Sequence, residues 1–316
     1  MISKRKVVLV GTGFVGMSMA YALECQGGIN ELVLIDVLKD KAEGEAMDLA
    51  HGLACAPSRI DIKAGEYDEC KDAAICVITA GLSQKPGQTR LELAKTNAGI
   101  VKSITEQVVE SGFKGIFVIA SNPVDLMTYV VQKTSGFPKE RVIGSGTVLD
   151  TARLRYLIGD KLKISPKNVH AYIMGEHGDS SFVPWSHSYV GCKSLKAILK
   201  ERNEKEEVLE EIYTKVQQAA YEIINRKKAT YYGIGLGLTK IVKAILNDEK
   251  EILTVSTYLD GNYGHSGLYI GVPAILGNKG VNDILDIPLS EEEQKKFDCS
   301  FEVLENMKKE IDNEIF

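Results

Sequence analysis

The stretch VVLVGTGFVG, residues 7–16, decides how the chain begins to fold. Its opening aliphatic residues predict a buried strand. The spacing G-x-G-x-x-G at Gly11, Gly13 and Gly16 follows directly and opens the helical stretch FVGMSMAYALECQG. Glycines are needed because the turn is tight, the backbone must approach a pyrophosphate, and the helix must pack closely on the strand. Since exposed N–H groups and the helix dipole hold phosphates there, the stretch predicts the loop of a dinucleotide-binding unit.

The next predicted strand, ELVLID at residues 31–36, ends on Asp36. Its offset from the glycines, about 20 residues, is that of the acidic residue that accepts hydrogen bonds from ribose hydroxyls in such units. A carboxylate at this position also disfavours the 2′-phosphate of NADP by repulsion. The alternative is a carboxylate that caps a turn at the strand end. Together with the loop, Asp36 predicts NAD as the cofactor.

Short apolar runs alternate with amphipathic stretches through the first half of the chain. The runs are KVVLV, ELVLID, AAICVITAG, GIFVIAS and RVIGSGTVLD. Between the third and the fourth run, residues 91–112 place apolar side chains on a helical period. This alternation predicts an α/β fold, namely a Rossmann-type doubly wound parallel sheet with crossover helices. We assign residues 1–145 to this NAD-binding domain.

After residue 145, longer helical stretches mix with strands, which predicts a mixed α+β domain that binds substrate and carries the catalytic residues, over residues 146–316. Its clearest helix spans residues 203–227, where apolar side chains form a stripe. Two predicted strands further on are joined by the turn-prone sequence NYGHSG. Near the end, Ser290 stands three residues before Glu293, a capping box that predicts the start of the last helix.

The composition excludes several classes of function. With 44% hydrophobic and 26% charged residues, it is that of an ordinary globular protein. The net charge of -5 argues against a nucleic-acid surface, which needs a basic face. The six cysteines form no CxxC pair, so we expect neither a metal site nor a redox motif.

The start of the chain imitates a signal peptide, because Lys4, Arg5 and Lys6 precede an apolar run. The glycines of the dinucleotide loop break that run, however, and cleavage would remove the motif. No segment approaches the roughly 20 apolar residues of a membrane helix. We therefore expect a cytoplasmic protein that acts on a small molecule.

The stretch GEHGD places His177 in glycine-rich surroundings, where an imidazole can lie exposed at a strand end. In DTARLR, Asp150 and Arg153 are three residues apart and would share one face of a helix. A carboxylate beside a histidine stabilises the imidazolium, and a guanidinium binds a substrate carboxylate through two parallel hydrogen bonds. The alternatives are a structural histidine and a surface ion pair.

Motifs from end to end of the chain complete this pattern: GTGFVG, LIDV, ITAG, SQKPGQTRLELAKTN, ASNPVD, GSGTVLDTARLRYLIG, GEHGD and ATYYGIGLGL. With them the chain resembles the bacterial L-lactate dehydrogenases of the lactate and malate dehydrogenase superfamily. The resemblance implies reversible hydride transfer between NADH and pyruvate, which gives L-lactate. His177 then matches the histidine that exchanges a proton with the substrate oxygen, and Asp150 matches its orienting partner. Arg153 matches the arginine that anchors the substrate carboxylate.

The resemblance assigns further residues to the site. Arg90 matches an arginine on a mobile loop that closes over the substrate and polarises its carbonyl, and the glycine and proline residues around SQKPG are typical of hinges. Asn122 matches a residue near both the nicotinamide and the substrate oxygen. The Asn122–Pro123 pair also resembles a turn that holds a cis peptide bond in the family.

The identity of the substrate depends on Gln84, which stands where malate dehydrogenases typically carry an arginine. A neutral amide leaves the second carboxylate of oxaloacetate without a counter-charge, so the resemblance implies pyruvate. Thr230 matches the threonine beside the substrate methyl group, and Ile234 matches the apolar residue that packs on the nicotinamide. A one-residue shift would put Lys85 at the selecting position, but the ungapped spacing to Arg90 argues against it. Malate and bulkier L-2-hydroxy acids stay as alternative substrates.

Arg155 and His170 match the pair with which many bacterial members bind fructose 1,6-bisphosphate between subunits. Cations repeated across a two-fold axis repel until a bisphosphate bridges them, so the resemblance implies an activator and a homotetramer. The alternative is a solvated helix arginine and a satisfied strand histidine. A catalytically silent NAD-binding protein is the alternative from another class. It would be free to lose catalytic side chains, and this chain has kept them.

Overall fold

The first half of the chain forms the parallel part of a large sheet. A computed structural model describes residues 5–82 and 90–316. In spatial order the parallel strands are β6 (Val142–Gly144), β5 (Ile116–Ile119), β4 (Ile75–Ile78), β1 (Lys6–Val10), β2 (Glu31–Ile35) and β3 (Asp61–Ala64). The order reverses between β1 and β4, the point at which doubly wound sheets bind ligands beyond the carboxyl ends of their strands. The predicted Rossmann-type sheet is confirmed.

An antiparallel hairpin from the second half extends the same sheet. The added strands are β10 (Glu251–Asp260), β11 (Ser266–Gly277) and β12 (Gly280–Ile284). β10 joins the parallel part by pairing Ser256 with Gly144 of β6. The order across the described part of the chain is therefore β12-β11-β10-β6-β5-β4-β1-β2-β3. The predicted domain boundary between residues 145 and 146 stays a prediction, since strands from both sides of it share this sheet.

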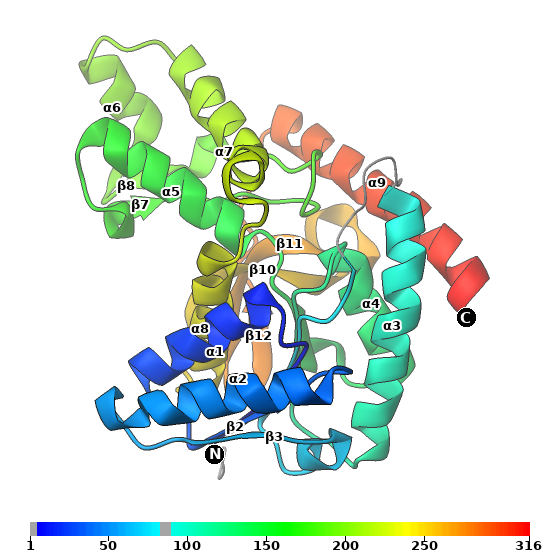
Figure 1. Cartoon of the computed structure of the whole chain (residues 1–316). Coiled ribbons are helices and arrows are strands. Elements are labelled where there is room, and N and C mark those ends of the chain that lie inside the picture. The colour runs from blue at the N-terminus through cyan, green and yellow to red at the C-terminus, as the bar shows by residue number, and fades with distance from the viewer. Residues whose placement is uncertain (1–4, 83–89) are drawn as a thin grey trace.

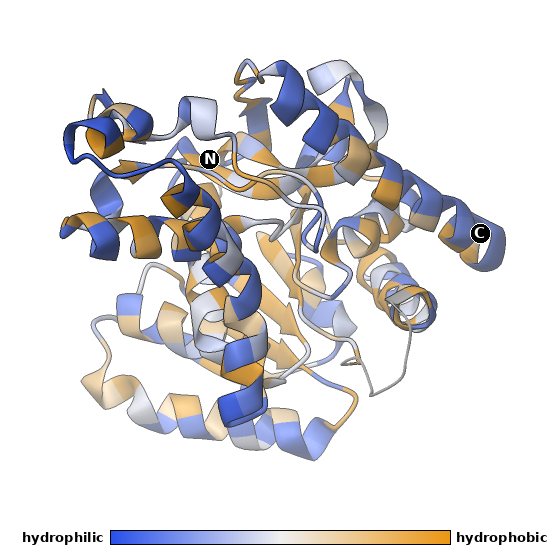
Figure 2. Ribbon diagram, turned by 90° about the horizontal axis from the view of Figure 1, so that it is seen from above, coloured by the Kyte–Doolittle hydropathy of each residue, from blue (hydrophilic) through white to orange (hydrophobic). Residues whose placement is uncertain are grey.

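Helices cover both faces of the sheet (Figure 1). One hydrophobic core joins the sheet to α1 (Phe14–Gln26), α2 (Lys39–Gly52) and α8 (Tyr232–Leu246). The other joins it to α3 (Arg90–Glu110), α4 (Val124–Ser135) and α9 (Glu291–Ile315). Figure 2 shows the central strands coloured mostly as hydrophobic and the outer helices carrying hydrophilic stretches. This arrangement gives the parallel strands their continuous apolar sequences, because both of their faces are buried.

A smaller lobe with its own core projects from the sheet, at the upper left of Figure 1. It contains α5 (Val148–Leu162), α6 (Leu195–Glu201) and α7 (Glu207–Lys227) with the short strands β7 (Val169–His170), β8 (Tyr189–Val190) and β9 (Lys193–Ser194). Turns of 3-10 helix complete the described elements: η1 (Leu53–Cys55), η2 (Tyr67–Cys70), η3 (Lys139–Arg141), η4 (Pro166–Asn168), η5 (Trp185–His187) and η6 (Asn262–Gly264).

Several local predictions can be compared with the structure. The helix expected over residues 203–227 is α7, which begins at Glu207. The capping box of α9 is confirmed, because Ser290 and Glu293 exchange hydrogen bonds between side chain and backbone. The peptide bond between Asn122 and Pro123 is cis, as the resemblance implied. Within residues 5–82 and 90–316, no helix is both long enough and apolar enough to span a membrane.

Candidate active site

The centre of the site is a hydrogen-bonded chain of three side chains. Asp150 lies in the first turn of α5 and Arg153 follows one turn later, so the two share a face of the helix. The Asp150 carboxylate accepts from Arg153 Nη1 at 3.0 Å and lies 2.7 Å from His177 Nδ1. Facing an ionised carboxylate, Nδ1 carries the proton and donates, which leaves Nε2 as the nitrogen that can reach a substrate. All three side chains are partly exposed.

The charges of the neighbouring side chains favour the protonated form of the His177 imidazole. Burial alone would lower the pKa of His177, but the charge and hydrogen bond of Asp150 hold it above its ordinary value. Burial likewise opposes ionisation of Asp150, yet His177 and Arg153 hold the pKa of that carboxyl below its ordinary range. The imidazolium is therefore available near neutral pH as a proton donor beside a guanidinium.

Long-range contacts place the segment that carries His177. We call residues 175–181 the His177 segment. At its start, Gly175 and Gly271 of β11 exchange backbone hydrogen bonds of 2.9 and 3.0 Å. The next residue, Glu176, donates its backbone N–H to Ser300 Oγ of α9 at 2.7 Å. Helix α9 and the hairpin therefore hold the imidazole in front of α5.

Asp125 supports His177 from behind, a role that sequence reasoning missed. This carboxylate is 2% exposed, accepts from the backbone N–H of His177 at 2.9 Å, and accepts from Ser256 Oγ at 2.5 Å. Burial raises the pKa of Asp125 to about 6. Its negative charge in turn helps to raise the pKa of His177. The signal available in the sequence was an acidic residue two positions after the proline of SNP, at the start of α4.

The glycine loop between β1 and α1 leaves room for a phosphate group. A Cβ at Gly11, where φ is +103°, would lie 2.6 Å from the backbone nitrogen of Ala80, and one at Gly16 would lie 2.3 Å from the carbonyl oxygen of Gly11. A Cβ at Gly13 would meet no atom within 4 Å. No side chain caps the N-terminus of α1, so its first N–H groups can bind an anion. These residues fit a pyrophosphate.

Asp36 follows β2 and lies beside the glycine loop. One carboxylate oxygen accepts from the backbone N–H of Thr12 at 2.7 Å and from its hydroxyl at 2.9 Å, and the other accepts from the backbone N–H of Leu38 at 3.0 Å. Burial opposes ionisation, but these hydrogen bonds and the nearby Lys41 hold the pKa of Asp36 below its ordinary value. The carboxylate is thus ionised and oriented, as an acceptor for ribose hydroxyls must be.

The remaining expected site residues approach from different elements. Asn122 is exposed at the cis peptide that follows β5, on the same edge of the sheet as Gly11 and Asp36. Thr230 lies half-buried between α7 and α8, and Ile234 packs against the core that includes α1. The segment Gln84–Gly87 lies outside the described residues. Arg90 is the first residue of α3, and its side chain lies outside the described part as well.

The comparisons with known proteins cover nearly the whole chain. A family model described as the lactate/malate dehydrogenase NAD binding domain matches residues 5–144. A second, the lactate/malate dehydrogenase alpha/beta C-terminal domain, matches residues 147–315. The chain belongs to the lactate/malate dehydrogenase family. This membership confirms the predicted family, its α/β fold with a Rossmann domain, and NAD as the cofactor of a dehydrogenase.

Individual dehydrogenases are similar over their full length. L-lactate dehydrogenase 1 of Bacillus cereus (strain ATCC 10987 / NRS 248) is 55% identical over 300 residues, which are 95% of this chain and 96% of that protein. L-lactate dehydrogenase 2 of Bacillus anthracis is 54% identical over the same shares. Comparison with the solved structure of the minor L-lactate dehydrogenase from Enterococcus mundtii, in its ligand-bound form, gives a TM-score of 0.95 at 51% identity and covers 98% of each chain. A lactate dehydrogenase from a Medee basin deep-sea metagenome library gives 0.96 at 52% identity, over 98% of this chain and 99% of that chain.

Two residues expected to bind a bisphosphate lie in the smaller lobe of this dehydrogenase. Arg155 donates from Nε to the carbonyl of Ala171 at 3.0 Å, and its guanidinium lies 4.9 Å from the ring centre of Tyr172. His170 is exposed in β7, next to that carbonyl in sequence. The structure therefore brings both residues to one part of the lobe.

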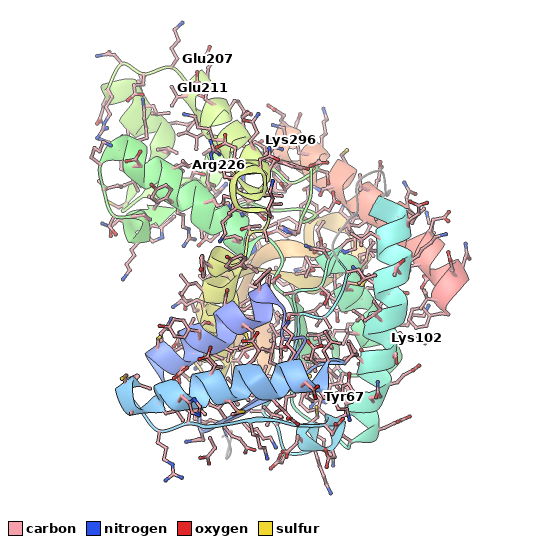
Figure 3. The ribbon with its side chains drawn as sticks, in the orientation of Figure 1. Tyr67, Lys102, Glu207, Glu211, Arg226 and Lys296 are labelled. Carbon is pink, nitrogen blue, oxygen red and sulfur yellow. The ribbon has the colours of Figure 1, made fainter. Side chains whose placement is uncertain are left out.

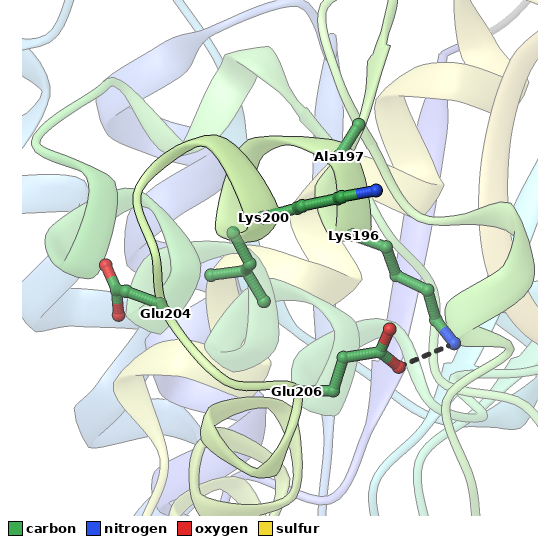
Figure 4. A pocket seen from close by; sticks show the side chains of 6 residues that line it. Lys196, Ala197, Lys200, Glu204 and Glu206 are labelled. Atoms are coloured by element: carbon green, nitrogen blue, oxygen red, sulfur yellow. Dashed lines mark ion pairs between the residues drawn. The ribbon is translucent and has the colours of Figure 1, made fainter.

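Two surface hollows in the described part of the chain are lined by residues other than the expected site residues. One of about 380 Å³ lies at α6 and the turn after it, where Lys196 and Glu206 form an ion pair of 2.9 Å (Figure 4). Another of about 260 Å³ lies beside the β10–β11 turn, next to Lys139 and Asp260. The side chains proposed for catalysis are instead gathered where α5, α4 and the His177 segment meet.

Proposed function

We propose that this protein catalyses the reversible reduction of pyruvate by NADH to L-lactate and NAD⁺. The observation that carries the proposal is the contact chain in which Asp150 joins the imidazole of His177 to the guanidinium of Arg153. It supplies a proton donor and a carboxylate anchor side by side, which is what a 2-keto acid requires. Its close relatives of 54 and 55% identity are named L-lactate dehydrogenases.

His177 acts as the acid in the direction of pyruvate reduction. When bound, NADH supplies the hydride that is added to the keto carbon, and negative charge then develops on the keto oxygen. Protonated His177 gives its Nε2 proton to that oxygen, while Asp150 stabilises the imidazolium through Nδ1. In the oxidation of lactate, neutral His177 accepts the hydroxyl proton. Asp125 keeps the backbone of His177 in place throughout.

Arg153 binds the substrate carboxylate through its planar fork of donors. Arg90 would add a second positive charge near the keto oxygen, and Asn122 would contact that oxygen and the nicotinamide. Gln84 and Thr230 select pyruvate over oxaloacetate and over bulkier 2-keto acids, because the site then offers no second counter-charge and little room. Ile234 would pack on the nicotinamide ring.

The direct test follows NADH absorbance in the presence of pyruvate, oxaloacetate and a bulkier 2-keto acid. We expect kcat/KM to be highest with pyruvate. Failure to oxidise NADH with all of these acids would refute the proposed activity and favour a silent NAD-binding protein. A preference for oxaloacetate or the bulkier acid would instead refute the roles of Gln84 and Thr230.

The proposal includes a homotetramer that fructose 1,6-bisphosphate activates through Arg155 and His170. Large apolar side chains such as Tyr21, Met47 and Leu236 are more than half exposed on α1, α2 and α8, which is typical of a surface covered by another subunit. The test measures the pyruvate KM and the sedimentation of the enzyme with and without the bisphosphate. The regulatory part is wrong if neither changes. A cytoplasmic location also stays a prediction.

A further inference from the structure

The His177 segment is also held from α7, by a phenol that the proposed reaction does not use. The hydroxyl of Tyr213 donates to the backbone carbonyl of Ser181 and lies 3.0 Å from Ser181 Oγ. Gln217, one turn later on α7, donates from Nε2 to the same phenol oxygen at 3.2 Å. The phenol is therefore fixed by contacts on two sides.

A short path leads from this phenol to the catalytic imidazole. Ser181 Oγ donates to the carbonyl of Gly178 at 3.1 Å, and Gly178 directly follows His177. The phenol also interacts electrostatically with the carboxylate of Asp150. Burial, and then the negative charge of Asp150, raise the pKa of Tyr213 above its ordinary value. Tyr213 is thus a protonated donor throughout the range in which the enzyme would work.

The other end of this path is α7 itself. The buried side chains of the helix, Leu209, Ile212 and Val216, pack it into the smaller lobe with α5. Figure 3 marks one end of α7 with Glu207 and the other with Arg226. From that second end the chain passes through Thr230 into α8. The contact between Tyr213 and the His177 segment therefore connects two parts of the site. One is α7, the helix that leads to Thr230, and the other is the segment that carries His177, the proposed proton donor.

We propose that Tyr213 is a positioning residue for proton transfer: through Ser181 and Gly178, its hydroxyl ties α7 to the His177 segment and sets where the imidazole stands relative to Arg153. The inference rests on the proposed reaction for its consequence, but the tie itself does not depend on it. Because the Tyr213 hydroxyl bonds to Ser181 and Gln217 and not to Arg153, loss of the tie affects the chemical step more than substrate binding.

The test compares Tyr213→Phe with Tyr221→Phe, a control two turns further along α7 whose ring is 60% exposed. We expect Tyr213→Phe to slow NADH oxidation in a single turnover about tenfold or more, while the KM for pyruvate stays within about twofold. The control should match the parent enzyme. An unchanged single-turnover rate in Tyr213→Phe, or a loss confined to KM, would overturn the proposal.

A double-mutant cycle with Ser181→Ala separates positioning from general packing. Ser181→Ala keeps the backbone carbonyl that accepts from Tyr213 and removes only the link from Ser181 Oγ to Gly178. If the effect of Tyr213 passes through that link, the double variant is about as slow as the slower single variant, whereas rate losses that simply multiply overturn the path through Oγ. Hydrogen exchange of the peptide covering residues 175–182 provides a measurement without substrate. It should become faster in Tyr213→Phe and not in Tyr221→Phe. Unchanged exchange in Tyr213→Phe refutes the tie. If the parent enzyme is inactive but exchange is faster in Tyr213→Phe, only the proposed reaction is refuted.

Discussion

At the scale of single residues, the pKa values in the site result from two opposing effects, burial and the charge of a neighbouring group. Burial opposes the charged forms of both His177 and Asp150, and each of the two offsets this effect for the other, which raises the pKa of His177 and lowers that of Asp150. Asp125 differs, because burial dominates and raises its pKa to about 6. The catalytic imidazole is therefore flanked by two carboxylates, one beside its ring and one beneath its backbone.

Removal of the second carboxylate tests this electrostatic arrangement. The charge of Asp125 raises the pKa of His177, so Asp125→Asn should lower it. Pyruvate reduction needs the protonated imidazole, and activity is lost as the pH rises through the pKa of His177. The pH profile of kcat/KM for pyruvate should then fall at a lower pH in the variant. An unchanged profile would mean that Asp125 acts only through its hydrogen bonds.

Arg153 provides the second prediction at this scale. Arg153→Lys keeps the positive charge but loses the planar pair of donors, so the KM for pyruvate should rise about 10- to 100-fold. Binding of NADH, followed by fluorescence titration, serves as the control and should not change. A parental KM for pyruvate would show that another group anchors the carboxylate.

At the scale of elements, the sequence predicted local features and missed long-range ones. The loop from β1 to α1, helix α7 and the capping box of α9 depend on neighbouring residues, so their patterns are visible in the sequence. The hydrogen bond from the backbone N–H of Glu176 to Ser300 joins residues more than a hundred positions apart, and no local pattern encodes it. The hairpin strands were also predicted, but their place beside β6 depends on tertiary pairing.

The glycine loop gives a prediction in which two similar substitutions have different effects. Gly16→Ala should lower the unfolding free energy by about 2 kcal/mol, because its Cβ would meet the carbonyl oxygen of Gly11 at 2.3 Å. Gly13→Ala meets no protein atom within 4 Å and should unfold at nearly the parental temperature, yet bind NADH at least about tenfold more weakly. Thermal unfolding and NADH titration separate the two. Equal NADH affinity in Gly13→Ala and the parent would contradict the proposed path of the pyrophosphate.

At the scale of the whole molecule, the continuous sheet makes the two halves depend on each other. The core on one face contains Val7 and Leu32 from the first half together with Leu238, Leu253 and Leu276 from the second. The two family models meet between residues 144 and 147. Because this core contains residues from both sides of that point, the two matched parts of the sequence do not have separate cores.

Unfolding should therefore follow a single cooperative transition. Circular dichroism in the far and near ultraviolet should report the same midpoint in denaturant. A fragment of residues 1–145 should fail to fold alone, because it would expose the edge of β6 and the apolar surface that α8 covers. Two separated transitions, or a folded fragment, would contradict this dependence.

The hydrogen bonds of Asp36 have a consequence for any attempt to exchange the cofactor. The carboxylate that would select the unphosphorylated ribose is the same one that receives both donors of Thr12. Replacing Asp36 with a residue that has no acceptor, in order to admit NADP, also deprives Thr12 of its acceptor and loosens the turn that would hold the pyrophosphate. A change of cofactor preference in this protein therefore requires a residue at position 36 that still accepts a hydrogen bond from the backbone N–H of Thr12.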